Sequence, residues 1–409
     1  MEVRPGFKHT EVGVIPEDWA VTHLRSIAAY RNGKAHEGLI SDLGQYVVVN
    51  SKFISTNGDI RKHSNVRFSP AAKGEVLMVM SDVPNGRAIA KCFFADRDDV
   101  YTVNQRICAL RPLDVNGRLL FYTLNRNPFY LAFDDGVKQT NLRKADVLSC
   151  PLAIPPTKAE QEAIAMALSD VDDLLSGLDR LIAKKRDLKQ AAMQQLLTGQ
   201  IRLPGFRGKW EVKRLGAVVD TDPENLGSGT KPDFAFNYIA LEDVDRGFLR
   251  SYSEQRFATA PSRARRKLRP DDVLVSTVRP NLRSHLLFRA ERGNWVCSTG
   301  FCVVRCRQGV VHPGYIFFHL FANCVSHQID ALLTGSNYPA INSGDVRSLE
   351  IPLPNYAEQT DIATVLFDMD AELSALEARR EKTRDLKQAM MQELLTGKTR
   401  LVPTGAAHA

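Results

Sequence analysis

The segment Asp187-Leu-Lys-Gln-Ala-Ala-Met-Gln-Gln-Leu-Leu-Thr-Gly199 returns as Asp385-Leu-Lys-Gln-Ala-Met-Met-Gln-Glu-Leu-Leu-Thr-Gly397, at an offset of 198 residues. The same offset carries Ala159-Glu160-Gln161 onto Ala357-Glu358-Gln359. This spacing is far longer than the period of about 20 to 50 residues that is typical of stacked repeats. The chain therefore contains a duplicated module, and we expect a function that is carried out twice, on a partner with two similar halves.

Within each copy, apolar residues recur in steps of four and three, which places them in one stripe along a helix, as in the seam of a coiled coil. Each copy spans roughly 40 residues and predicts a rod on the order of 60 Å long, at about 1.5 Å per residue. We expect the two helices to pair as an antiparallel coiled coil; the alternative is that each pairs with a partner chain. The predicted seam residues are Ile164, Leu168, Val171, Leu175, Leu178 and Ile182 in the first copy, and Ile362, Leu366, Met369, Leu373 and Leu376 in the second.

Two segments of similar length, 1–155 and 200–353, precede the helical copies and keep landmarks in the same order. Trp19–Leu24 corresponds to Trp210–Leu215, and Gly136–Leu142 corresponds to Gly335–Ile341. Both segments consist of short strand patterns separated by Asn, Gly and Pro turns, with a few short helices. The predicted fold class is therefore α+β, with two domains of curved, mainly antiparallel sheet separated by two long helices. The predicted divisions are domain 1 (1–155), helix 1 (156–199), domain 2 (200–353), helix 2 (354–403) and a tail (404–409).

Composition limits the possible partners and compartments. The 409 residues include 54 Lys plus Arg and 47 Asp plus Glu, a net charge of +7 that permits a nucleic-acid partner without requiring one. The seven cysteines show no C-x-x-C pair, so we interpret them as reduced thiols. No apolar run is long enough for a membrane span, and the N-terminus is not a signal peptide, so we expect a cytoplasmic protein with no membrane contact.

Enzyme signatures are missing from the sequence. It contains no phosphate-binding G-x-x-x-x-G-K-[ST] loop, no G-x-G-x-x-G fingerprint, no H-E-x-x-H helix and no G-x-S-x-G elbow. Asn127-Pro-Phe-Tyr130 is similar to the base-gripping loop of amino methyltransferases, but Phe129 stands where the second proline belongs. We therefore interpret Asn127–Tyr130 as a turn that ends a helix. The pattern predicts a binding protein without catalytic residues, cofactor or metal of its own.

The landmarks together resemble the specificity (S) subunit of type I restriction–modification systems. Thr10–Trp19 looks like the start of a target-recognition domain, and the segments from Ala159 to Gly199 and from Ala357 to Gly397 resemble the two conserved helical regions of that family. The resemblance covers almost the whole chain, in the order domain, helix, domain, helix. Leu395–Leu401 also parallels Leu197–Leu203, which fits a circular arrangement of the two halves.

The resemblance implies a division of labour within a larger complex. Each recognition domain would read one half of a bipartite double-stranded DNA target, and the paired helices would fix the spacing. Two methylase (M) subunits would dock on the helices and supply S-adenosylmethionine and adenine-N6 methylation. Two restriction (R) subunits would add an ATP-dependent motor and nuclease that uses magnesium. The chain itself would not be an enzyme.

We expect DNA contacts from cations, which hold phosphates, and from polar side chains, which read base edges. In domain 1 they are Lys52, Asn57, Arg61, Lys62, Asn85, Arg87, Lys138, Gln139, Asn141 and Arg143. In domain 2 they are Arg263, Arg265, Arg266, Lys267, Arg279, Asn281, Arg283, Ser336, Asn337 and Tyr338. The segments 136–141 and 335–338 are the first choices, because glycine and polar amides let backbone approach DNA closely.

Two other functions fit parts of this pattern. A stand-alone nuclease or methyltransferase would show activity as a purified chain, and the missing motifs argue against it. A coiled-coil scaffold with protein-binding globular ends would show DNA affinity that is absent or independent of sequence.

Overall fold

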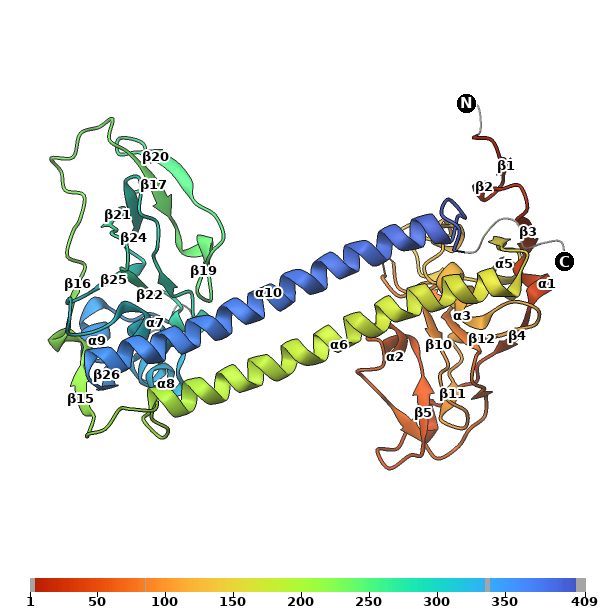
Figure 1. Cartoon of the computed structure of the whole chain (residues 1–409), viewed down its shortest axis with the longest axis horizontal. Coiled ribbons are helices and arrows are strands. Elements are labelled where there is room, and N and C mark those ends of the chain that lie inside the picture. The colour runs from red at the N-terminus through yellow and green to blue at the C-terminus, as the bar shows by residue number, and fades with distance from the viewer. Residues whose placement is uncertain (1–3, 85, 335–338, 402–409) are drawn as a thin grey trace. The chain divides into compact units, whose positions relative to one another are not determined.

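The structure is a computed structural model that describes residues 4–84, 86–334 and 339–401. It divides into two compact units (Figure 1). Unit 1 comprises residues 1–178 and 379–409, and unit 2 comprises residues 179–378. Each unit therefore contains one globular domain and a part of each long helix.

The domain of unit 1 is built on two four-stranded sheets. One sheet has the antiparallel order β10-β8-β12-β4, and the other has the order β6-β5-β11-β7, in which β5 and β11 run parallel. A separate antiparallel pair, β3 with β14, joins the two ends of the domain. The bounds are β3 (Ala20–His23), β4 (Ala28–Asn32), β5 (Tyr46–Val49), β6 (His63–Ser64), β7 (Pro70–Ala71), β8 (Val76–Val79), β10 (Cys92–Phe94), β11 (Tyr101–Val103), β12 (Ile107–Pro112) and β14 (Pro151–Ile154).

Strand β8 lies between two hydrophobic cores, and all four of its residues are fully buried. Val76 and Met78 belong to one core, whereas Leu77 and Val79 belong to the other. This division follows from the period of two in a strand, where successive side chains point to opposite faces. A continuous apolar run is therefore what a strand buried on both faces requires.

Unit 2 repeats this plan with different side chains. Its sheets have the orders β16-β25-β22-β23 and β20-β17-β24-β21, with one parallel pair, β17 with β24. Strands β15 and β26 join the ends of the domain, as β3 and β14 do in unit 1. The bounds are β15 (Glu211–Arg214), β16 (Val219–Thr221), β17 (Ala235–Ile239), β20 (Ser253–Arg256), β21 (Ala264–Lys267), β22 (Val273–Ser276), β23 (Leu286–Leu287), β24 (Trp295–Ser298), β25 (Phe301–Cys306) and β26 (Glu350–Leu353).

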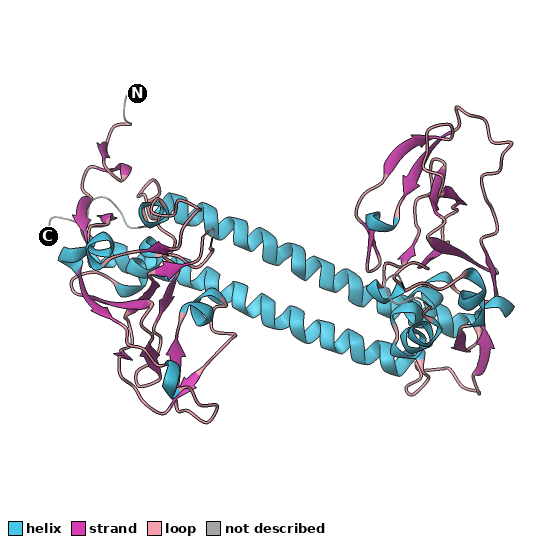
Figure 2. Cartoon of the chain, turned by 180° about the vertical axis from the view of Figure 1, so that it is seen from behind, coloured by secondary structure: helices cyan, strands magenta, loops and turns pink. Residues whose placement is uncertain are grey.

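The predicted α+β class with mainly antiparallel sheets is confirmed, with one parallel strand pair in each domain as a detail that the sequence did not indicate. Short helices complete the domains, and Figure 2 shows them among the strands. They are α1 (Leu24–Ile27), α2 (Ser51–Ser55), α3 (Gly117–Leu124), α4 (Pro128–Leu131) and α5 (Lys144–Leu148) in unit 1, and α7 (Pro313–Phe321), α8 (Asn323–Leu332) and α9 (Ser343–Ser348) in unit 2.

The long helices are α6 (Lys158–Leu197) and α10 (Tyr356–Leu394). The Thr157 hydroxyl accepts the Glu160 N–H at 3.2 Å, and the Asn355 amide oxygen accepts the Glu358 N–H at 3.0 Å, so each helix begins with a side-chain cap. Gly199 and Gly397 follow the two helices with φ of 71° and 69°, the left-handed conformation that favours glycine after a helix. Start and stop are thus encoded in the same way in both copies.

The two helices pair antiparallel within each unit, because residue numbers rise along one helix as they fall along the other. In unit 1, Lys387 Nζ lies 2.6 Å from Asp172 Oδ1. In unit 2, Lys185 Nζ lies 2.6 Å from Glu372 Oε1, and Lys189 pairs with Asp370. All eleven predicted seam residues are buried or half-buried: Ile164, Leu168, Val171, Leu175, Leu178, Ile182, Ile362, Leu366, Met369, Leu373 and Leu376.

In each unit, an arginine that binds a buried glutamate joins the domain to the start of a long helix. We call these two pairs, Arg202–Glu358 and Arg400–Glu160, the ionic clasps. In unit 2, Arg202 donates two hydrogen bonds to the fully buried Glu358 carboxylate and lies over the Trp210 ring at 5.2 Å. In unit 1, Arg400 does the same for Glu160 and lies over the Trp19 ring at 5.9 Å. The hydrogen bonds that Arg400 donates to the Glu160 carboxylate raise the pKa of its guanidinium. The arginine that completes the clasp of domain 1 therefore lies in the segment after the second long helix.

Candidate nucleic-acid interface

The polar segment 138–141 of domain 1 lies beside a second loop that is far away in sequence. Strand β13 (Thr140–Asn141) pairs antiparallel with β9 (Ser81–Asp82). The Gln139 amide donates to Ser81 Oγ at 2.7 Å, and Ser81 Oγ donates to Asn141 Oδ1 at 2.6 Å. Gln139 and Asn141 are both exposed and also bond to each other: Gln139 Nε2 donates to Asn141 Oδ1 at 3.3 Å, and Asn141 Nδ2 donates to the Gln139 backbone carbonyl at 3.4 Å. We call residues 81–84, 86–89 and 138–143 recognition edge 1.

The second loop of recognition edge 1 is held in shape by one carboxylate. Asp82 Oδ2 accepts the N–H groups of Ala88 at 2.6 Å and Ile89 at 3.1 Å. A Cβ on Gly86 would lie 2.1 Å from this Asp82 oxygen, so a larger residue there would displace the carboxylate from these N–H groups. The loop presents Arg87 to solvent. The predicted contact Asn85 lies outside the described residues.

Domain 2 joins the corresponding two segments in the same way. Val278 forms an isolated antiparallel bridge with Ala340, and the Arg279 N–H donates to the Pro339 carbonyl at 2.8 Å. The loop that follows presents Asn281 and ends at Arg283. We call residues 277–283 and 339–341 recognition edge 2. Three predicted contacts, Ser336, Asn337 and Tyr338, lie outside the described residues, as does the whole preferred segment 335–338.

A cleft of about 280 Å³ in domain 1 is lined by part of a second predicted group. Lys52 and Lys62 line it together with Asn104 and Arg106, which are not among the predicted contacts. Arg106 directly precedes β12, and a cation just before a strand is the sequence feature that could have pointed to it. The other members of the group, Asn57 and Arg61, are exposed, and Arg143 is exposed in recognition edge 1.

The basic strand β21 of domain 2 is engaged within its own domain. Arg266 pairs with Asp222, and Lys267 Nζ lies 3.6 Å from Glu224 Oε2. Arg265 is half-buried, with its guanidinium 5.0 Å from the Phe257 ring centroid. These three residues remain predictions as DNA contacts, but their charges already have internal partners. Arg263, just before the strand, is exposed.

Comparison with known proteins identifies this arrangement. A family model described as type I restriction modification DNA specificity domain matches residues 16–184 and 277–383. The chain belongs to this family.

Two curated members come from Methanocaldococcus jannaschii. The putative type I restriction enzyme MjaX specificity subunit is 24% identical over 428 residues, covering 97% of each chain. The MjaVIII specificity subunit is 21% identical over 413 residues, covering 95% of this chain and 94% of that protein. The similarity therefore spans both domains and both helices.

Solved structures share the fold of this specificity chain. The S subunit of a type I restriction–modification system from M. genitalium superposes with a TM-score of 0.61 at 16% identity, covering 96% of this chain and 98% of that one. A chain from a study of type I R-M complex assembly and conformational transition gives 0.53 at 18% identity, covering 94% and 99%. The sequence-based resemblance to S subunits is confirmed.

The segment Asn127–Tyr130 of this specificity chain is structural, and the predicted turn at the end of a helix is present. The Asn127 side-chain amide donates to the Thr123 carbonyl in the last turn of α3 at 2.9 Å. Asn127 Oδ1 also accepts the Phe129 N–H at 2.9 Å, so the same residue begins the short helix α4. Tyr130 is fully buried and its hydroxyl donates to the Val147 carbonyl at 2.9 Å. Neither side chain is available to grip a base.

Five of the seven cysteines are buried in hydrophobic cores. Burial raises the pKa of the Cys108 and Cys302 thiols to about 12, so these thiols are protonated. Among the described residues, no three His, Cys, Asp or Glu side chains come together in a way that could hold a metal ion. Within the same residues, no helix has the length and apolar character needed to cross a membrane.

Proposed function

We propose that this chain is the DNA sequence-recognition subunit of a type I restriction–modification complex, with recognition edge 1 and recognition edge 2 each reading one half of a bipartite target. The observation that carries the proposal is the repeated joining of two distant loops at equivalent places in both domains. The backbone pairing is the same in both domains, but the exposed side chains differ. Recognition edge 1 carries Gln139 and Asn141, whereas recognition edge 2 carries Asn281. Amides that can both donate and accept suit base edges in a groove.

Cations around the edges support a DNA partner. Lys138 and Arg143 flank the amides of recognition edge 1, and Arg87 lies on its other loop. Phosphate contacts of this kind position a protein on the duplex and give salt-dependent affinity, whereas base contacts give the sequence preference. The proposed contacts in both domains are therefore of two kinds. The amides would give the sequence preference, and the cations would position the protein on the DNA.

Docking of two methylase subunits on the helices is the second part of the proposal. Leu188 of α6 and Leu386 of α10 are 47% and 54% exposed, and they occupy the same position in the two copies. A large apolar side chain exposed on a helix face at matched places supports one docking point per unit. The partner subunits would bring S-adenosylmethionine, ATP and magnesium, two restriction subunits would complete the complex, and the chain itself would be non-catalytic and cytoplasmic.

The test is adenine-methylation mapping with the chain and its partner methylase, comparing the parent with Gln139→Ala and Asn281→Ala. Each substitution should relax or change one half of the methylated motif and leave the other half unchanged. Gln200→Ala, which removes an exposed glutamine outside both edges, serves as the matched control. Motifs that stay identical in both variants would refute reading by these edges. Methylation unaffected by removal of the whole chain would favour the scaffold function instead.

A further inference from the structure

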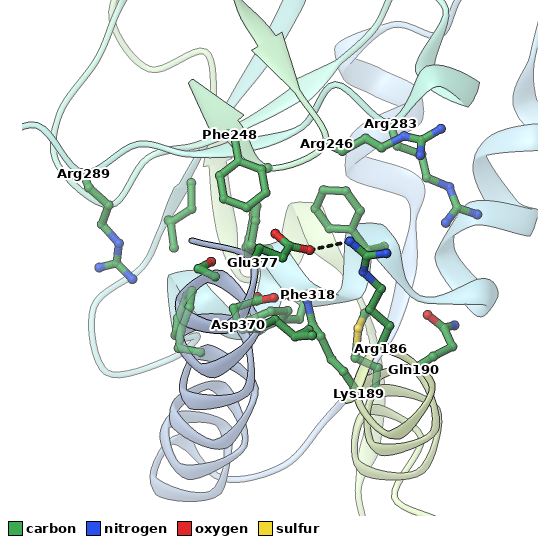
Figure 3. A pocket seen from close by; sticks show the side chains of 18 residues that line it. Arg186, Lys189, Gln190, Arg246, Phe248, Arg283, Arg289, Phe318, Asp370 and Glu377 are labelled. Carbon is green, nitrogen blue, oxygen red and sulfur yellow. Dashed lines mark hydrogen bonds and ion pairs between the residues drawn. The ribbon is translucent and has the colours of Figure 1, made fainter. Parts of the chain in front are cut away.

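Unit 2 contains a cavity of about 530 Å³ that shares Arg283 with recognition edge 2 and is otherwise lined by residues outside both edges (Figure 3). It lies where the later part of α6 and the first part of α10 meet α7 and the turn between β18 (Val244–Asp245) and β19 (Phe248–Leu249). Its volume is in the range of about 300 to 1,000 Å³ that is typical of small-molecule sites.

The cavity has an aromatic wall made by five phenylalanines. Phe317 and Phe318 of α7 pack against Phe367 of α10, with ring centroids 6.3 Å and 4.7 Å apart. Phe321 and Phe248, which is 53% exposed, line the same cavity. Aromatic faces and edges of this kind bind flat rings through offset and edge-to-face contacts.

The cations around the cavity are of two kinds. On the helices, Arg186 pairs with Glu377 and Lys189 pairs with Asp370, so these four charges balance (Figure 3). Arg289 also lines the cavity, and its guanidinium has a carboxylate partner at 2.6 Å, in Asp271.

Arg246 and Arg283 come from the domain side and differ from the other cations. No carboxylate among the described residues pairs with either guanidinium. Their backbones have φ of 42° and 58°, the left-handed region that non-glycine residues rarely adopt. Backbone strain of this kind persists only where the surrounding structure fixes it. Two cations without a carboxylate partner, beside an aromatic wall, have the chemistry to bind an anion attached to a ring.

The equivalent place in unit 1 has a different composition, so the cavity is not part of the duplicated frame. There, Tyr122 stands beside the helix pair, its hydroxyl donates to Asp172 at 2.7 Å, and Lys387 lies 5.4 Å from its ring centroid. In unit 2 the corresponding lysine, Lys189, lies over the ring of Phe318, which has no hydroxyl. A function shared by both halves would require similar side chains in both units.

We propose that this cavity binds a small aromatic compound that carries one anionic group, with the ring against the phenylalanine wall and the anion between Arg246 and Arg283. A DNA phosphate would satisfy the two arginines but would leave the apolar wall unfilled. Arg283 also ends recognition edge 2, but the proposal does not depend on which bases the two edges read. Because the walls belong to both long helices and to domain 2, the ligand would stabilise their packing within unit 2.

The test uses the full chain and the dye 1-anilinonaphthalene-8-sulfonate, followed by fluorescence and calorimetry. We expect saturable binding of one dye per chain, and displacement by 2-naphthoate. Arg246→Gln and Arg283→Gln should each weaken dye binding about tenfold, the effect of losing one charge-assisted hydrogen bond. Binding of the uncharged analogue N-phenyl-1-naphthylamine should be unchanged in both variants.

Ser374→Trp, which fills the cavity, should abolish binding of both compounds. Ser176→Trp places the same residue at the equivalent position of the other copy and should change neither. If Ser374→Trp fails to fold by circular dichroism, the two arginine variants decide the outcome. Dye affinity that does not depend on either arginine would overturn the proposal. Displacement by a DNA duplex and not by 2-naphthoate would also overturn it, by assigning the two arginines to nucleic acid.

Discussion

Replacing Arg400 by alanine should destabilise domain 1, although residue 400 lies 382 positions away from its partner Asp18 in sequence. Arg400 is 18% exposed as a side chain, and the Glu160 carboxylate that it binds is fully buried. Two further hydrogen bonds, both 3.0 Å long, join it to Asp18. Arg400→Ala would therefore leave one buried carboxylate without its cation.

The expected loss follows from the burial of Glu160. Removing one partner of a buried ion pair typically costs 3 to 5 kcal/mol, because the remaining charge stays in a poorly solvated place. Since Arg400 itself reaches solvent, we expect about 3 kcal/mol in the free energy of unfolding of unit 1. For a unit of this size the melting temperature should fall by about 6 to 12 °C.

Trp19 provides the assay, because it is buried in domain 1 against the clasp. In a background with Trp210→Phe and Trp295→Phe, its fluorescence reports denaturant unfolding of unit 1 alone. Arg400→Leu combined with Glu160→Leu should recover most of the loss, since apolar pairs often replace buried ion pairs at little cost. A loss below about 1 kcal/mol would put this clasp among exposed ion pairs and refute the reasoning.

Three other predictions concern acid stability, the helix seam and base reading. His285 and His319 are buried, and burial lowers the pKa of each to about 3, so the unfolded chain takes up protons below pH 6.5 that the folded chain does not. Unit 2 should thus lose about 1.4 kcal/mol per histidine for each pH unit between 6.5 and 3, and His319→Phe should roughly halve the slope in acid-unfolding curves. Leu168→Ala removes a fully buried seam residue and should cost about 2 to 5 kcal/mol, whereas Leu174→Ala, at a position 44% exposed, should change denaturant stability by less than about 0.5 kcal/mol. Gln139→Ala should reduce discrimination at one base pair by about 1 to 3 kcal/mol in competition binding, and equal loss on all sequences would assign it to phosphate.

Periodic and duplicated features were predictable from the sequence. The seam is visible because a helix repeats its environment every three or four residues, and the repeat of Ala159–Gln161 fixed where each helix begins. The class of the domains followed from short apolar runs such as Gly74–Met80, which contains β8. Buried strands and amphipathic helices are local consequences of apolar spacing, so one sequence suffices to find them.

Which residues the fold brings together at the recognition edges was not predictable from the sequence in the same way. Recognition edge 1 depends on β9 and β13, which are two residues each and too short to leave a periodic signal. The interior ion pairs of Arg266 and Lys267 depend on Asp222 and Glu224, more than forty positions away in sequence. A cluster of basic residues in a sequence does not reveal which charges are already neutralised by the fold.

The discontinuous composition of unit 1 has a consequence for biosynthesis. Its globular domain leaves the ribosome first, but its helix partner and Arg400 are translated only after the whole of unit 2, about 200 residues later. At roughly 5 to 20 residues per second, the nascent domain waits about 10 to 40 seconds with the Glu160 carboxylate unclasped. The part of the protein that is made first is therefore completed last, and a late nonsense codon would damage the domain encoded at the opposite end of the reading frame.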